Sequence, residues 1–194
     1  MSSLQFRWGI KPLDWPQMSA TPDQSNIKWA MKILFVGDEG AGKTDLMCGV
    51  ADGVYIDGFQ RKLGSSFGAK RFELDPVRVQ LQIWNVTDSP KFTNLRRQFY
   101  RGGAGVVYVF SLTDRASFES ILDWVAEVRR VIGDVPAILV GTQRETRERR
   151  RVTKREAKQL AKHLGIPYLE MGMDPDPQFE RALQDMVVDI LKPT

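Results

Sequence analysis

From residue 30 onward, the chain alternates between short apolar runs and longer segments with one apolar face. Continuous apolar runs predict strands that are buried on both faces, as in a parallel sheet. They are AMKILFVG at 30–37, GVVYVFSL at 105–112, PAILVG at 136–141 and IPYLEM at 166–171. Two further segments, KRFEL and VRVQLQIW, alternate apolar and polar residues on either side of Asp75-Pro76, which predicts an antiparallel hairpin.

Three segments between the predicted strands carry apolar residues at helical spacing. The stripes run through residues 118–128, 157–164 and 179–190. The second stripe begins after Thr153 and Glu156, whose spacing predicts a capping box at the start of a helix. Strands that alternate with helices, together with one hairpin, predict an α/β fold of three layers with a mostly parallel sheet.

The composition is that of a single soluble domain with an irregular arm in front of it. The chain has 194 residues, of which 42% are hydrophobic and 27% charged, as in an ordinary globular protein. Residues 1–27 contain three prolines and two tryptophans without periodicity, so we expect an irregular arm ahead of a domain at 28–194. No apolar run approaches the roughly 18 residues of a membrane span, and the single cysteine, Cys48, which we expect in the core, favours a reducing compartment. We therefore expect a cytoplasmic protein without a signal peptide or lipid anchor.

The basic residues are concentrated in one segment. Residues 144–162 hold nine Lys or Arg and three Glu, whereas the net charge of the whole chain is +4. Such a run indicates either a solvated face or a contact for an anionic partner. We do not expect nucleic acid to be that partner.

The sequence GDEGAGKT at 37–44 has the spacing of a phosphate-binding loop and lies between a predicted strand and a helix. In such a loop, glycines let backbone N–H groups point at phosphate oxygens, and the next helix adds its positive N-terminal end. Lys43 would neutralise the β- and γ-phosphates, and the hydroxyl of Thr44 would bind Mg²⁺. The candidate binding residues are Gly37, Asp38, Glu39, Gly40, Ala41, Gly42, Lys43, Thr44 and Asp45.

Four segments together carry a resemblance to a known family. They are KILFVGDEGAGKT, LQIWNV, FYRGGAGVVYVFSLTDRASFESILDWVAEVRR and VPAILVGT. With these motifs the chain resembles the small GTPases of the Ras superfamily, and among them the Rab branch, over about residues 30–191. The resemblance implies a P-loop fold with a six-stranded sheet, one antiparallel hairpin and about five helices. It also implies binding of GTP or GDP with Mg²⁺ and places a base-stacking aromatic at Tyr55.

The chain departs from the family at residues that respond to the γ-phosphate. The Mg²⁺-binding threonine of the family is Lys62 here, and the Asp-Thr-Ala-Gly motif is replaced by Asn85-Val86-Thr87-Asp88. Asn85 lacks the charge that helps to hold the metal, and Asp88 would bring a carboxylate towards an anionic phosphate, where the charges repel. The glutamine that orients the attacking water is Ser89, which is too short for that geometry. We expect a weakened Mg²⁺ site and weak or absent hydrolysis, with no intact catalytic residue.

The loops that would read the base are also altered. The family's Asn-Lys-x-Asp is replaced by Thr142-Gln143-Arg144-Glu145, and its Ser-Ala-Lys loop by Gly172-Met173-Asp174. Glu145 can still accept hydrogen bonds from guanine, and a backbone N–H at 172–173 can still meet the guanine O6. The candidate base-binding residues are therefore Tyr55, Thr142, Gln143, Glu145, Gly172 and Met173.

Two functions are consistent with this mixture of kept and altered motifs. The first is an atypical Rab-like protein that binds guanine nucleotide and hydrolyses it weakly or not at all. The alternative is a pseudo-GTPase that serves as an interaction or scaffold module, with nucleotide structural or absent. The altered base-reading loop also leaves room for a different nucleotide or phosphate-bearing ligand. Both main hypotheses predict a protein effector or assembly partner at the switch region, through which any membrane association would arise.

Overall fold

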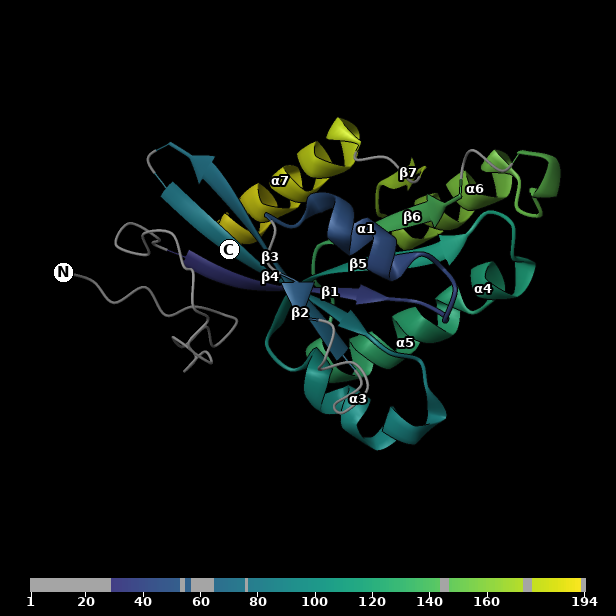
Figure 1. Cartoon of the computed structure of the whole chain (residues 1–194), viewed down its shortest axis with the longest axis horizontal. Coiled ribbons are helices and arrows are strands. Elements are labelled where there is room, and N and C mark those ends of the chain that lie inside the picture. The colour runs from purple at the N-terminus through teal and green to yellow at the C-terminus, as the bar shows by residue number, and fades with distance from the viewer. Residues whose placement is uncertain are drawn as a thin grey trace.

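The computed structural model describes residues 29–52, 55–56, 65–75, 77–143, 147–172 and 176–192. The expected arm at 1–27 lies outside these residues, so the domain boundary at residue 28 stays a prediction. At the centre is a sheet of seven strands in the order β2-β3-β4-β1-β5-β6-β7 (Figure 1). The α/β fold class predicted from the alternation of patterns is confirmed.

The strands fall where the apolar runs predict them, with one addition. They are β1 Trp29–Val36, β2 Tyr55–Ile56, β3 Ser65–Leu74, β4 Val77–Val86, β5 Gly103–Ser111, β6 Ala137–Thr142 and β7 Tyr168–Glu170. β1 pairs in parallel with β4 and β5, and β6 joins β5 to β7, also in parallel. The expected hairpin is β3–β4, and the two-residue β2 adds a seventh, antiparallel strand at the edge beside β3.

The helices are α1 Lys43–Val50, α3 Thr93–Tyr100, α4 Arg115–Glu119, α5 Ile121–Ile132, α6 Lys154–Leu164 and α7 Pro177–Leu191, with short 3₁₀ turns at Pro90–Phe92 and Arg147–Arg149. The stripe at 118–128 predicts one helix, and the structure divides it into α4 and α5 at Ser120. The backbone of Ser120 keeps helical angles, so the interruption is a single residue. The capping box of α6 is present between Thr153 and Glu156.

Two apolar clusters, one on each face of the sheet, form the core. One cluster joins α1 and α7 to the sheet, and the other joins α3, α5 and α6 to the opposite face. Figure 1 shows α7 above the sheet and α3 and α5 below it. Within β1, Ile33 and Phe35 belong to the first cluster and Leu34 and Val36 to the second. β1 is therefore apolar at successive positions because both of its faces are covered.

The expectation that Cys48 is a core residue is wrong. Helix α1 buries Lys43, Leu46, Met47 and Val50, and Cys48 lies between them in sequence but is exposed. The α-helical period turns each residue about 100° from the one before it, so Cys48 leaves the buried face directly after Met47. Among the described helices, none combines the length and apolarity that crossing a membrane requires.

Candidate functional site

The phosphate-loop sequence lies at the carboxyl end of β1, where β1, β5 and β6 all point (Figure 1). Gly37 has φ 153°, and a Cβ built on it would lie 2.0 Å from the carbonyl oxygen of Val109, so only glycine fits. Gly40 and Gly42 also have positive φ, 78° and 82°. The loop therefore takes the backbone path that its glycines predict, and α1 begins directly after it at Lys43.

The side chain of Lys43 is hydrogen-bonded to the backbone of the phosphate loop. Its side chain is buried, with 7% of its surface exposed, and Nζ donates to the carbonyl oxygens of Gly37 and Asp38, both at 2.6 Å. Burial lowers the pKa of Lys43 to about 8, and the carboxylates of Asp88, Asp38 and Glu39 act against that shift. An ammonium has three N–H donors, so one remains for a ligand after these two hydrogen bonds.

A hollow of about 620 Å³, partly open to solvent, lies over the loop. Its walls come from the loop, from the first turn of α1 and from Thr87 and Asp88 beyond the end of β4. The Lys43 ammonium, the loop N–H groups and the start of α1 make this hollow suitable for phosphate. The structure thus brings together the phosphate-loop residues and Asp88, as their positions in the sequence predict.

Asp38 is fixed by residues that the sequence did not single out. Its carboxylate accepts hydrogen bonds from Ser120 Oγ at 2.8 Å and from Trp124 Nε1 at 2.6 Å. Ser120 and Trp124 are one turn apart at the start of α5, so they present their donors on the same side of the helix. These contacts tie the phosphate loop to α5, and Asp38 faces that helix with its side chain.

Thr44 and Asn85 meet at the expected metal position. Asn85 is 1% exposed, and its Nδ2 donates to Thr44 Oγ1 at 3.0 Å. Its Oδ1 is buried and receives no hydrogen bond from the residues that the structure describes. Both side chains are neutral, and the described residues contain no cluster of three or more His, Cys, Asp and Glu. Mg²⁺ accepts oxygen ligands and is often held by only one or two protein groups together with phosphates. Thr44 Oγ1 and Asn85 Oδ1 are oxygen atoms that fit an ion arriving with a nucleotide.

The carboxylate of Asp88 reaches the phosphate loop itself. Its Oδ2 accepts the backbone N–H of Glu39 at 2.6 Å, and its carbonyl oxygen accepts from Arg96 Nη1 at 3.0 Å. Ser89, at the water-orienting position, donates its backbone N–H to Thr87 Oγ1 at 3.3 Å. An acidic side chain rather than a water-orienting group therefore stands beside the loop.

Arg96 connects Asp88 to the helices below the sheet. It is 9% exposed, its Nε contacts Glu127 Oε1 at 2.9 Å, and its guanidinium carbon lies 4.8 Å from the ring centre of Trp124. Tyr100 Oη also donates to Glu127 Oε1, at 3.3 Å. Burial, aided by the negative charge of Glu127, raises the pKa of Tyr100 far above its usual value. The network holds α3 against α5 and fixes the backbone of Asp88.

The expected base-reading residues are described only in part. Thr142 is buried, and its hydroxyl donates to the carbonyl of Ala41 at 2.7 Å, with the carbonyl of Phe110 as an alternative acceptor at 3.2 Å, so it joins this loop to the phosphate loop. Gln143 has φ 61°, and its Oε1 accepts from the hydroxyls of Ser111 and Thr113. Its side chain is thereby tied to the end of β5.

Other candidates near the base-reading loop fall at or beyond the limits of the described structure. Gly172 is half-buried directly after Met171, whose N–H donates to Gly141. Glu145, Met173, Lys62 and the side chain of Tyr55 lie outside the described residues.

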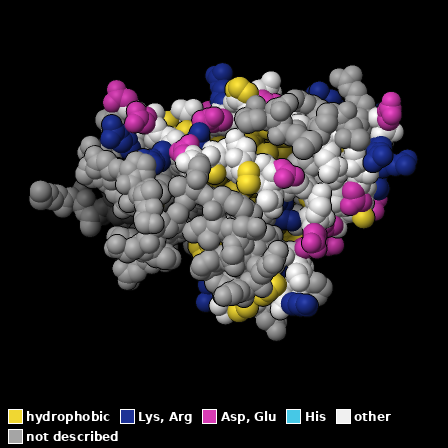
Figure 2. Space-filling model, viewed as in Figure 1, with side chains coloured by type: hydrophobic (Ala, Val, Ile, Leu, Met, Phe, Trp, Pro, Cys, Tyr) yellow, Lys and Arg dark blue, Asp and Glu magenta, His cyan; other side chains and the backbone are white. Residues whose placement is uncertain are grey.

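The basic segment at 144–162 is partly neutralised where it is described. Arg150 makes two hydrogen bonds to the carboxylate of Glu170, at 3.1 and 2.7 Å, which hold the pKa of that carboxyl below its usual value. Glu156 pairs with Arg115 at 2.6 Å. In Figure 2, Lys and Arg side chains at the right-hand end of the molecule stand among Asp and Glu side chains. The charges on this side are therefore mixed rather than uniformly positive.

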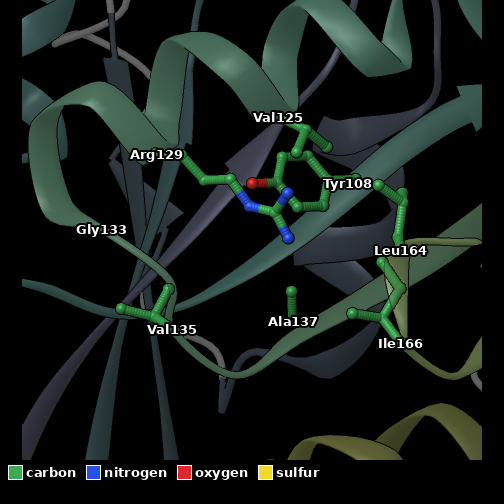
Figure 3. A pocket seen from close by; sticks show the side chains of 8 residues that line it. All are labelled: Tyr108, Val125, Arg129, Gly133, Val135, Ala137, Leu164 and Ile166. Atoms are coloured by element: carbon green, nitrogen blue, oxygen red, sulfur yellow. The ribbon is translucent and has the colours of Figure 1, made fainter.

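A second hollow, of about 290 Å³, lies between α5 and α6, away from the phosphate loop (Figure 3). Tyr108 and Arg129 extend into it among mainly apolar side chains. Burial raises the pKa of Tyr108 to about 12, so its hydroxyl stays protonated at neutral pH. The groups suited to phosphate, which are the loop N–H groups, Lys43 and the start of α1, line the first hollow.

A match to a known protein family covers the region that contains the phosphate loop. The model of the Ras family matches residues 32–192 of the chain. The matched range includes the phosphate loop, the β3–β4 hairpin and every described helix.

Proposed function

The chain belongs to the Ras family of small GTP-binding proteins, and we propose that within it the protein is an atypical, Rab-like member. It binds guanine nucleotide, hydrolyses GTP weakly or not at all, and acts through protein partners. The observation that carries nucleotide binding is the phosphate loop, in which buried Lys43 spans two loop carbonyls at 2.6 Å and keeps one donor for phosphate.

Weak hydrolysis is supported by the residues beyond β4. A water-orienting group needs hydrogen-bond reach to the attacking water, and Ser89 offers only a short hydroxyl at that position. Asp88 adds a negative charge beside the loop, where the transferred phosphoryl group is itself anionic. Bound Mg²⁺ would neutralise phosphate charge, and the neutral pair Thr44 and Asn85 would hold it less firmly than a carboxylate.

The pseudo-GTPase alternative has an observation of its own. The contact between Asp88 and the Glu39 N–H satisfies a loop donor from within the protein, so the loop is stabilised without an external anion. In that case the fold would present a surface to partners, and nucleotide would be structural or absent. Nucleotide binding is favoured over this alternative because Lys43 and the glycine backbone angles of the loop are retained.

A partner surface is supported by two half-buried aromatic side chains, Trp84 on β4 and Phe99 on α3, with the buried ring of Phe67 on β3 behind Trp84. The ring of Trp84 lies 4.2 Å from that of Phe67 and 6.2 Å from that of Phe99, and Lys32 Nζ sits 3.7 Å from the Trp84 ring centre. Leu95 on α3 is 40% exposed nearby in the sequence. Aromatic and apolar side chains of this kind dominate protein interfaces. We propose that a protein effector docks here in the cytoplasm. Any association with a membrane would come through that partner. The basic segment 144–162 would then be available to a second, anionic partner.

Titration with fluorescent GDP, GTP and ATP, with and without Mg²⁺, tests nucleotide binding. Guanine nucleotides should bind with micromolar or tighter affinity and ATP much more weakly. Lys43→Ala should weaken binding at least about tenfold, because it removes a charged hydrogen-bond donor. Lys158→Ala, at an exposed position on α6, is the matched control and should bind like the wild type. If no nucleotide binds, the pseudo-GTPase alternative replaces this proposal.

A single-turnover assay tests the second part of the proposal. GTP bound to the protein should be converted to GDP more slowly than by an ordinary Rab-like protein measured in parallel. Equal rates would show that the replacements at residues 85–89 do not impair hydrolysis.

A further inference from the structure

We propose that the carboxylate of Asp88 takes the place of the terminal phosphate in the loop, so that the protein binds nucleoside diphosphates in preference to triphosphates. This inference rests on the proposed function, since it assumes that a guanine nucleotide occupies the phosphate loop. It makes Asp88 a specificity-determining residue for that site.

The backbone N–H of Glu39 in the phosphate loop is already hydrogen-bonded within the protein. Asp88 Oδ2 accepts the backbone N–H of Glu39 at 2.6 Å, and the ionised carboxylate makes this a charge-assisted hydrogen bond. The loop's N–H groups are the donors that would otherwise face phosphate oxygens. A phosphate oxygen that needs the Glu39 N–H must therefore displace a carboxylate that is already bound there.

The position of the contact indicates which phosphate is affected. Glu39 lies in the first half of the loop, whereas the inner phosphates lie nearer the N-terminal end of α1, which begins at Lys43. Asp88 lines the same hollow as Lys43 and Glu39, and its negative charge acts to raise the pKa of Lys43. Because the lysine of such a loop reaches the β- and γ-phosphates, the Asp88 carboxylate stands at the γ end.

The backbone of Asp88 is held in place by contacts that do not involve any ligand. Arg96 donates to the carbonyl oxygen of Asp88 at 3.0 Å and is itself fixed by Glu127 at 2.9 Å. Arg96 is 9% exposed and packs over Trp124. Arg96 and Glu127 thus hold the backbone of Asp88 in position. The contact of its carboxylate with Glu39 forms without a bound nucleotide.

The charge at the loop also favours the smaller anion. The negative charges of Asp88, Asp38 and Glu39 all act on Lys43. The Asp38 carboxylate is hydrogen-bonded to Ser120 and Trp124 on α5, and that of Asp88 accepts the Glu39 N–H inside the hollow. A γ-phosphate would enter beside Asp88 and be repelled by it. A nucleoside diphosphate has no γ-phosphate to bring beside Asp88. It can therefore bind while the hydrogen bond between Asp88 and the Glu39 N–H stays in place.

The test measures the dissociation constants of GDP and GTP for the full chain in excess Mg²⁺. Wild-type protein should bind GDP at least about tenfold more tightly than GTP, the effect of one charge-assisted hydrogen bond. Asp88→Asn keeps an acceptor for the Glu39 N–H but removes the charge, and Asp88→Gly removes both. The affinity for GTP should rise in the order wild type, Asp88→Asn, Asp88→Gly, while the affinity for GDP changes less than about threefold. Thermal unfolding of each variant checks that it is folded.

Glu39→Gln is the matched control, because it removes a nearby negative charge but leaves the backbone N–H and Asp88 in place. It should change the ratio of GTP to GDP affinity by less than Asp88→Asn does. An equal change would overturn the proposal in favour of a general charge effect, and so would an equal gain in GDP and GTP affinity on replacing Asp88.

The wild-type measurement is decisive even if both variants of Asp88 fail to fold. GTP binding as tight as GDP binding would overturn this inference and leave nucleotide binding standing. Failure of both nucleotides to bind the wild type and the folded variants would instead overturn the proposed function, and this inference with it.

Discussion

Arg96 is the residue through which the stability of the site is most directly measured. We consider its replacement by methionine, which keeps much of the stem and removes the guanidinium. The change breaks the contact with Glu127 at 2.9 Å and the hydrogen bond to the carbonyl of Asp88 at 3.0 Å. It also removes the stacking over Trp124 at 4.8 Å. Since Arg96 is 9% exposed, water replaces these partners poorly.

The expected loss follows from these contacts. A hydrogen bond to a charged group contributes about 1.5–3 kcal/mol, and the cation–π contact roughly 0.5–1 kcal/mol. The three terms share one side chain and do not add. The carboxylate left behind, Glu127, is 26% exposed and keeps the hydroxyl of Tyr100, which limits its penalty. We expect Arg96→Met to lower the free energy of unfolding by about 2–3 kcal/mol.

Urea unfolding, followed by far-ultraviolet circular dichroism, measures this loss. The midpoint should fall while the dependence on urea stays the same, because the surface exposed on unfolding does not change. Arg97→Met, at the exposed neighbouring position on α3, is the control and should change stability by less than about 0.5 kcal/mol. Arg96→Lys should fall between the two, since lysine keeps the charge and loses the planar fork. A loss below about 0.5 kcal/mol for Arg96→Met would refute this account of the network.

Three further predictions concern the loop and its surroundings. Gly37→Ala should prevent folding or cost several kcal/mol, roughly 3 or more, in urea unfolding, because its Cβ would lie 2.0 Å from the Val109 carbonyl oxygen; a wild-type midpoint would contradict this. Thr142→Val should cost about 1–2 kcal/mol in the same assay. It removes the hydroxyl that donates to the Ala41 carbonyl at 2.7 Å, with the Phe110 carbonyl at 3.2 Å as the alternative acceptor; an unchanged midpoint would mean that this hydrogen bond contributes nothing. Burial lowers the pKa values of Lys32 and Lys43 to about 8, so between about pH 8 and 10 the unfolded chain holds more protons and stability of the ligand-free protein should rise with pH. Urea unfolding at about pH 7.5 and 9.5 checks this rise, and Lys43→Met should reduce it.

Local signals account for most of what the sequence predicted about the fold. Apart from Lys32, the run at 30–37 has no polar side chain because β1 is covered on both faces. The alternation around Asp75-Pro76 reflects the β3–β4 hairpin. Strand β2 has only two residues, Tyr55 and Ile56, which is too short for any period to show. The break at Ser120 was also invisible, because its backbone stays helical and the stripe continues across it.

The site was predictable where it depends on local sequence and not where it depends on distant pairs. The spacing of Gly37, Gly42 and Lys43 indicates a phosphate loop, and in the structure Gly37 and Gly42 have positive φ and Lys43 Nζ reaches the Gly37 carbonyl. The hydrogen bond from Trp124 to Asp38 joins residues 86 apart, and neither side chain carries a signal for its partner. Asp88 was expected to approach the phosphates because of its place in a motif, but its contact with the Glu39 N–H required the structure.

The exposed position of Cys48 gives this protein a natural attachment point for a reporter. It is the single cysteine of the chain, and it lies on α1 five residues after Lys43, at an exposed position. A thiol-reactive dye would therefore attach at one site, without mutagenesis and without entering the core. Because α1 begins at the phosphate loop, the dye would report on that end of the molecule as ligand is added. Time-resolved binding measurements on the otherwise natural sequence become possible because α1 turns the side chain of its third-from-last residue, Cys48, towards solvent.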